Sequence, residues 1–133
     1  MNRRTVTTIC AIVPALFLLV IGIIHWVVNV SGLRRALARG EIAPRLGETI
    51  LFNAAFSGLF MSLFGLILLL LLPGLRTGSR QAGRVAAAIG TGIGLVGVVG
   101  FVRVPTKPLV LIFLLFSLPL LIPILLWRRD GAP

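Results

Sequence analysis

The sequence predicts an all-α fold, specifically an integral membrane four-helix bundle with short loops and antiparallel neighbouring helices. Composition is the first reason, because hydrophobic residues make up 58% and charged residues 12% of the 133 residues, whereas soluble domains carry about 25% charged residues. The second reason is that the apolar residues fall into four long runs. Helices are expected because an open sheet edge cannot satisfy its hydrogen bonds in lipid. The length suits one membrane domain over residues 1–133.

The apolar runs define the expected transmembrane helices, at about residues 6–30, 49–72, 85–102 and 109–127. With a rise of about 1.5 Å per residue they are roughly 27 to 37 Å long, enough to cross a hydrocarbon core of about 30 Å. The first run follows Asn2-Arg3-Arg4, as in a signal peptide, but it exceeds the usual apolar length of about 7–15 residues. We therefore expect it to be a retained anchor.

Particular residues predict where the helices begin and end. Glu48 suits the positive N-terminal end of the second helix, and Pro73-Gly74 is expected to close that helix. Ser79 is the expected N-cap of the third helix. Residues 32–40 place leucine and alanine on one helical face and arginine largely off it. They form either an amphipathic turn on the membrane surface or a frayed continuation of the first helix.

The basic residues lie outside the apolar runs or at their edges, and they give a net charge of +10. This placement is typical of contact with lipid headgroups, so we expect no nucleic acid partner. In a four-span topology, seven basic residues share the side of the termini: Arg3, Arg4, Arg76, Arg80, Arg84, Arg128 and Arg129. Six lie on the other side: Arg34, Arg35, Arg39, Arg45, Arg103 and Lys107. The positive-inside rule then predicts cytoplasmic termini by a margin of one residue.

Two stripes of small residues predict close packing between helices, since small side chains let helix backbones approach. The Gly58 stripe, on the second helix, consists of Ala54, Gly58, Ser62 and Gly65. The Gly94 stripe, on the third, consists of Ala86, Gly90, Gly94 and Gly97. We expect the second and third helices to pack through these stripes, or one stripe to form a homodimer. Residues 92–97 also match GxGxxG, but a dinucleotide site needs a preceding strand and a later acidic residue, so packing is favoured.

A polar cluster is expected at the end of the bundle opposite the termini. His25 and Asn29 share a face of the first helix, and Asn53 and Ser57 share a face of the second. The candidate polar pocket therefore consists of His25, Asn29, Asn53, Ser57, Arg103 and Lys107. Polar groups at membrane depth are costly unless satisfied and often mark function. The alternative is packing, with hydrogen bonds between helices of about 0.6 kcal/mol each.

A ligand of this pocket would have an anionic head and an apolar body, as a membrane lipid has.

The sequence lacks the residues that several other functions require. No Asp or Glu lies within the apolar runs, although a proton-coupled small multidrug exporter needs an intramembrane carboxylate. One histidine and one cysteine, Cys10, are too few for a metal site. His25 with Ser57 has no acid at that depth to orient it for hydrolysis. We therefore expect no metal, no cofactor and no enzymatic activity.

Several residues carry a resemblance to a known group of proteins. They are Gly22-Ile23-Ile24-His25-Trp26 in the first helix, and Phe56, Phe60, Phe64 and Gly65 in the second. With the short loops, they resemble small bacterial inner-membrane proteins with four transmembrane helices and no characterised activity. The similarity extends over most of the chain, but Pro105-Thr106-Lys107-Pro108-Leu109 departs from the usual turn into the last helix. The resemblance implies a bacterial inner membrane and transfers no functional residue.

Together these observations favour a multi-pass membrane protein that binds a lipid or a membrane partner without catalysing a reaction. The expected partners are membrane lipids, a second copy in a homodimer, or a larger membrane complex. The alternative is a small transporter component, or a dimeric transporter that works without an intramembrane carboxylate. An enzyme acting on a lipid substrate ranks third.

Overall fold

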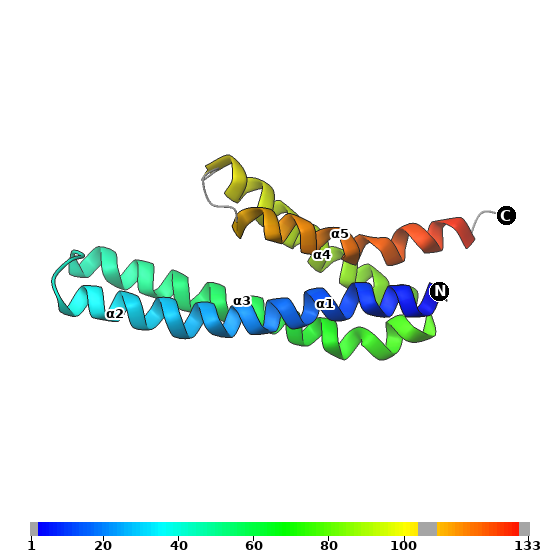
Figure 1. The fold of residues 1–133 in the computed structure, drawn as a ribbon, viewed down its shortest axis with the longest axis horizontal. Helices are drawn as coiled ribbons and strands as arrows, with labels where there is room; N and C mark the ends of the chain where they lie inside the picture. The colour runs from blue at the N-terminus through cyan, green and yellow to red at the C-terminus, as the bar shows by residue number, and fades with distance from the viewer. Residues whose placement is uncertain (1–2, 104–108, 131–133) are drawn as a thin grey trace. The chain divides into compact units, whose positions relative to one another are not determined.

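The computed structural model describes the backbone of residues 3–103 and 109–130 and the side chains of residues 5–103 and 111–122. The elements are α1 (Arg3–Ile24), η1 (His25–Asn29), α2 (Val30–Ala38), α3 (Pro44–Thr77), α4 (Arg80–Arg103) and α5 (Leu109–Asp130). The described residues contain no strand (Figure 1), which confirms the predicted all-α class. Outside them lie the expected last connection, with Pro105, Lys107 and Pro108, and the side chains of Arg128 and Arg129.

Three helices are long and apolar enough to cross a membrane: Thr5–Ala38 and Pro44–Thr77, with 34 residues each, and Arg80–Arg103, with 24. The first is continuous because α1 passes through η1 into α2 without a break. In α5, the apolar stretch with described side chains, Leu111–Ile122, is shorter. The prediction of four helices is confirmed, and three of them have the length and composition of a span.

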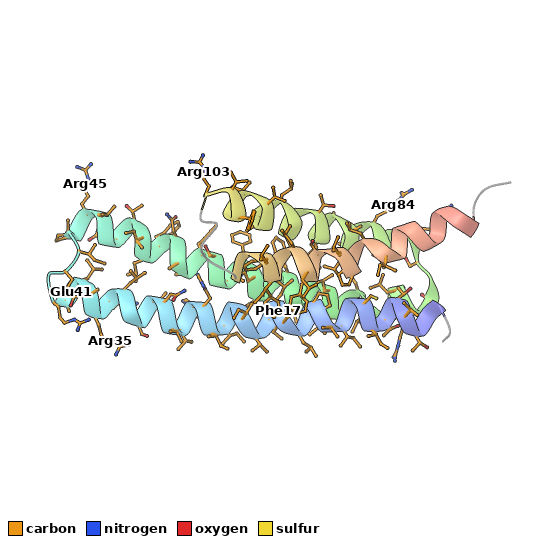
Figure 2. The ribbon with its side chains drawn as sticks, turned by 45° about the horizontal axis from the view of Figure 1, so that its top comes forward. Phe17, Arg35, Glu41, Arg45, Arg84 and Arg103 are labelled. Atoms are coloured by element: carbon orange, nitrogen blue, oxygen red, sulfur yellow. The ribbon has the colours of Figure 1, made fainter. Side chains whose placement is uncertain are left out.

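The first two of these helices extend well beyond their apolar runs. The stretch 32–40 continues the first helix as α2 as far as Ala38, instead of forming a separate turn. A helix of 34 residues is about 51 Å long, against a bilayer hydrocarbon core of about 30 Å. Arg35, Glu41 and Arg45 lie at the loop end of this long hairpin (Figure 2). The hairpin therefore carries charged residues on its extension beyond the apolar runs.

Glycines in the left-handed conformation end two helices, Gly40 after α2 (φ 69°) and Gly78 after α3 (φ 80°). The Gly78 N–H donates to the carbonyl of Leu75 at 3.2 Å, and the Ser79 N–H donates to the carbonyl of Gly74 at 2.8 Å. The same pair of bonds follows Gly40. Both turns are Schellman motifs, in which the left-handed residue lets the next N–H groups satisfy carbonyls of the last helical turn.

The predicted end of the second helix at Pro73-Gly74 is wrong, because α3 runs through Pro73 to Thr77. The Thr77 hydroxyl donates to the carbonyls of Pro73 at 3.2 Å and Gly74 at 3.0 Å. These bonds satisfy carbonyls of the last turn locally, and proline is more frequent in apolar membrane helices than in soluble ones. Termination therefore moves to Gly78, the first residue with positive φ.

The start of α4 matches the prediction, whereas the start of α3 does not. Ser79 caps α4 as predicted, because its Oγ accepts a hydrogen bond from the Ala82 N–H at 3.4 Å. In contrast, α3 begins at Pro44, before the expected start at Glu48, so its first turn contains no acidic residue. Proline suits the first helical position because its missing N–H would have no partner there.

The chain divides into two compact units, the 16–66 unit and the terminal unit of residues 1–15 and 67–133. In the 16–66 unit, the first helix packs antiparallel against α3. In the terminal unit, α4 packs along α5. The fully buried side chains of the terminal unit include Ala15, Leu68, Ala86 and Leu120. Many large apolar side chains are exposed instead, for example Leu70 and Val102, both at 72%.

Candidate functional site

The predicted polar residues of the first helix lie in η1, a single π-helical turn between α1 and α2. The Asn29 amide donates to Nδ1 of His25 at 2.7 Å. Both side chains are half-buried. Isolated π turns in helices frequently mark functional positions.

The predicted polar residues of the second helix form a local pair of their own. Asn53 and Ser57 are both exposed on α3, and the Ser57 hydroxyl donates to the Asn53 carbonyl at 2.7 Å. Such bonding to the preceding turn satisfies a hydroxyl locally, without a partner helix. Among the described residues, no hydrogen bond joins His25 or Asn29 to Asn53 or Ser57. The structure thus shows two local pairs and no shared polar contact between them.

The remaining two members of the predicted pocket lie outside the 16–66 unit. Arg103 is the exposed last residue of α4, in the terminal unit. Lys107 lies outside the described residues. Within the 16–66 unit, the four described members of the predicted pocket form two separate pairs.

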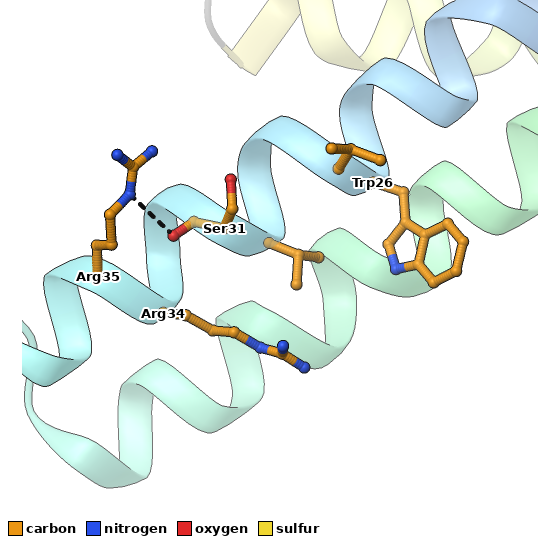
Figure 3. A pocket seen from close by; sticks show the side chains of 6 residues that line it. Trp26, Ser31, Arg34 and Arg35 are labelled. Atoms are coloured by element: carbon orange, nitrogen blue, oxygen red, sulfur yellow. Dashed lines mark hydrogen bonds between the residues drawn. The ribbon is translucent and has the colours of Figure 1, made fainter.

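A groove that the sequence did not predict lies beside the π turn. We call it the Trp26 groove; it is lined by Trp26, Val27, Val30, Ser31, Arg34 and Arg35 and encloses about 420 Å³. The lining residues form two rows spaced four apart, which run from apolar side chains to arginine. In Figure 3 the Arg34 and Arg35 side chains diverge, with Arg34 on the same side as Trp26 and Arg35 bonded to Ser31. This spacing was visible in the sequence, as an apolar helical face that ends on two arginines.

The two guanidinium groups of the Trp26 groove have no carboxylate partner among the residues that the structure describes. Arg35 Nε donates to the Ser31 carbonyl at 3.3 Å (Figure 3). Arg34 has no hydrogen-bond or ion-pair partner among the described residues. The nearby carboxylate of Glu41 is engaged by Arg39 at 2.9 Å. The polar end of the groove therefore has uncompensated positive charge, which suits an anion.

A second, apolar hollow borders the other side of Trp26. We call it the Phe56 groove; it is lined by Trp26, Phe52, Ala55, Phe56 and Leu59 and encloses about 230 Å³. It forms where the small Ala55 lies between larger side chains of α3. Phe52 and Phe56 stack with ring centroids 5.3 Å apart, so one wall is aromatic. Trp26 is common to both grooves.

The Gly58 stripe positions Trp26. A Cβ added at Gly58 would lie 2.8 Å from the Gly22 carbonyl oxygen and 2.8 Å from Trp26 Cβ. A Cβ added at Gly22 would lie 2.5 Å from Ser62 Oγ. Of the other members of this stripe, Ala54 is half-buried and Gly65 is buried. Close backbone approach therefore sets the position of Trp26 relative to α3.

The Gly94 stripe packs on α5. A Cβ added at Gly90 would lie 2.7 Å from Leu120 Cβ, and one at Gly94 would lie 3.1 Å from Ser117 Oγ. The other members of the stripe, Ala86 and Gly97, are also buried. Each stripe therefore meets a helix of its own unit, the first helix for the Gly58 stripe and α5 for the Gly94 stripe.

Among the described residues, no group of three His, Cys, Asp or Glu side chains gathers closely enough to hold a metal ion. No protein-family model, curated protein or solved structure matches this chain. The local geometry of the two grooves is therefore the basis for a functional interpretation.

Proposed function

We propose that this chain is an integral membrane protein that binds an anionic phospholipid without catalysing a reaction. The observation that carries the proposal is the Trp26 groove, in which an apolar wall leads to two guanidinium groups that pair with no described carboxylate. A phospholipid has the complementary order, with apolar chains below an anionic phosphate. Guanidinium groups match phosphate oxygens well because they can donate two parallel hydrogen bonds.

Insertion in a membrane is supported by the exposed side chains of the helices. Phe52, Leu70 and Leu115 are 64%, 72% and 66% exposed, and comparable residues occur on all of the long helices. A soluble monomer rarely leaves contiguous apolar surface of this extent in water. In lipid this exposure has no cost. The proposed location is the bacterial inner membrane with cytoplasmic termini, for which the family resemblance and the positive-inside rule are the support.

The depth of the Trp26 groove supports a headgroup contact. Trp26 and Arg34 are two helical turns apart, so their Cα atoms differ by about 12 Å along the helix axis. Tryptophan side chains favour the membrane interface, and arginine side chains near span ends extend their charge to the headgroups. With these preferences, the groove would cross the boundary between hydrocarbon and headgroups. An acyl chain would then lie along Trp26 into the Phe56 groove.

The test is lipid retention by the full-length protein, purified in mild detergent and examined by native mass spectrometry with phosphatidylglycerol as the probe. We expect Arg34→Gln to weaken retention about fivefold, since one arginine near an anionic headgroup contributes about 1 kcal/mol. Arg45→Gln is the matched control, because it removes the same charge from an exposed arginine near the same hairpin turn. It should retain the lipid.

Asn53→Ala separates the Trp26 groove from the predicted polar pocket. Asn53 is exposed and contacts neither groove, so this variant should retain phosphatidylglycerol like the unmodified chain. Equal losses in the Arg34 and Arg45 variants would overturn the site, because they would show binding to surface charge in general. A loss in the Asn53 variant with none in the Arg34 variant would favour the polar pocket instead.

A further inference from the structure

We propose a second phospholipid site at the opposite end of the long hairpin, independent of the Trp26 groove. It is a groove of about 280 Å³, here called the Thr5 groove, lined by Thr5, Thr8, Ile9, Ile12 and Arg76. All five residues belong to the terminal unit. The proposed occupant is an anionic phospholipid of the leaflet that faces the termini.

The order of side chains in the Thr5 groove matches an amphipathic ligand. Its four residues from α1 are spaced so that they share one helical face. Two threonines come first, near the helix end, and two isoleucines follow toward the middle of the apolar run. The Thr5 side chain is exposed, its hydroxyl forms no hydrogen bond with any residue that the structure describes, and Ile9 is 48% exposed. A hydroxyl group and an apolar wall are thus both open to a ligand.

Arg76 provides the positive charge, and the end of its own helix does not use it. An arginine in the last turn of a helix often bonds to the final carbonyls. Here those carbonyls are taken: Thr77 Oγ1 donates to Pro73 and Gly74, and the Gly78 N–H donates to Leu75. Arg76 is exposed, with no hydrogen-bond or ion-pair partner among the described residues. Its guanidinium is therefore available to a phosphate.

The two grooves involve opposite ends of one continuous helix. Thr5 begins the described apolar helix Thr5–Ala38, and Arg34 and Arg35 lie near its other end. This helix of 34 residues is about 51 Å long, and a bilayer with its headgroups is about 40–45 Å thick. A chain that spans the membrane would therefore present one groove to each leaflet.

Counting bound lipids tests the second site separately from the first. Full-length protein with phosphatidylglycerol, examined by native mass spectrometry, should retain two tightly bound lipids. We expect one lipid in Arg76→Gln, one in the double variant Arg34→Gln/Arg35→Gln, and none when all three changes are combined. Arg80→Gln is the matched control, an exposed arginine of the same turn that lies outside the groove, and it should retain two. Arg76→Lys should also retain two, because the charge is kept.

Each outcome decides between the two sites. If Arg76→Gln retains two lipids, or if it loses lipid no more than Arg80→Gln, the second site is wrong while the Trp26 groove stands. If Arg76→Gln loses a lipid and Arg34→Gln/Arg35→Gln loses none, the Thr5 groove stands and the Trp26 groove is wrong. Glycerol 3-phosphate added in excess should leave both lipids bound, because the isoleucine wall recognises the chain. Displacement by that soluble phosphate would overturn the lipid assignment in favour of a free phosphate site.

Discussion

At the scale of single residues, Trp26 connects helix packing to the candidate site. Its indole borders both the Trp26 groove and the Phe56 groove. Its backbone lies against Gly58, where a Cβ would be 2.8 Å from Trp26 N. A change at Gly58 therefore acts on ligand contacts through the position of Trp26, without touching the ligand.

Gly58→Leu should lower stability and lipid retention together. The added side chain would meet backbone of the first helix, and overpacking of this kind costs about 1–3 kcal/mol. Thermal unfolding in detergent and phosphatidylglycerol retention measure the two effects. Gly92→Leu is the control, because nothing lies within 4 Å of a Cβ at that glycine. Equal melting temperatures for the two variants would contradict the close approach at Gly58.

At the scale of elements, η1 determines how α2 is turned relative to α1. The π turn covers His25–Asn29 and fits more residues into a turn than an α-helix does. It therefore rotates every later side chain, including Arg34 and Arg35, relative to the residues before it. The direction of the arginine side chains relative to the apolar wall of the Trp26 groove therefore depends on this turn.

Deleting Val28 should convert the π turn into a regular α-helical turn. A π turn holds about one residue more than an α-helical turn, so this deletion removes the extra residue and leaves Arg34 on the same side of the helix. We expect unchanged helix content by circular dichroism and full phosphatidylglycerol retention. Deleting Gly32, in the regular α-helix α2, should instead rotate Arg34 by about 100° relative to Trp26 and weaken retention as Arg34→Gln does. Equal retention in the two deletion variants would show that the direction of Arg34 is irrelevant to binding.

At the scale of the whole molecule, both small-residue stripes are occupied within one chain. Gly58 lies against the first helix, and Gly94 lies against Ser117 of α5. A homodimer built through these stripes would have to displace contacts that each unit already makes. The outer faces, with side chains such as Leu70 and Leu115, are left for lipid or for a larger membrane partner.

The expected orientation of the whole chain rests on seven basic residues on one side and six on the other. The rule places the more basic side in the cytoplasm. A fluorescent reporter fused after Pro133 should therefore be bright, and alkaline phosphatase inserted in the loop of residues 39–43 should be active outside. The opposite pattern would reverse the leaflets assigned to the Trp26 and Thr5 grooves, without changing the grooves themselves.

The sequence by itself determined the helical class, the four helices and the Ser79 cap. These features depend on local quantities, namely hydropathy along the chain and hydrogen bonds between residues three or four apart. The i, i+4 pairing of His25 with Asn29 was predictable for the same reason, and the structure shows it as a hydrogen bond. Two predicted helix boundaries were wrong. The helix α3 continues past Pro73, and it begins at Pro44 instead of near Glu48.

Only the tertiary structure decided which helix each glycine stripe meets and where the grooves lie. The Phe56 groove joins Trp26 to residues of α3 that are far from it in sequence, and helical periodicity cannot specify such a contact. The π turn that orients Arg34 has no signal in hydropathy either, since one extra residue in a turn leaves the apolar run unbroken. The predicted polar residues therefore separate into two local pairs, and the better candidate site forms where Trp26 packs against Gly58.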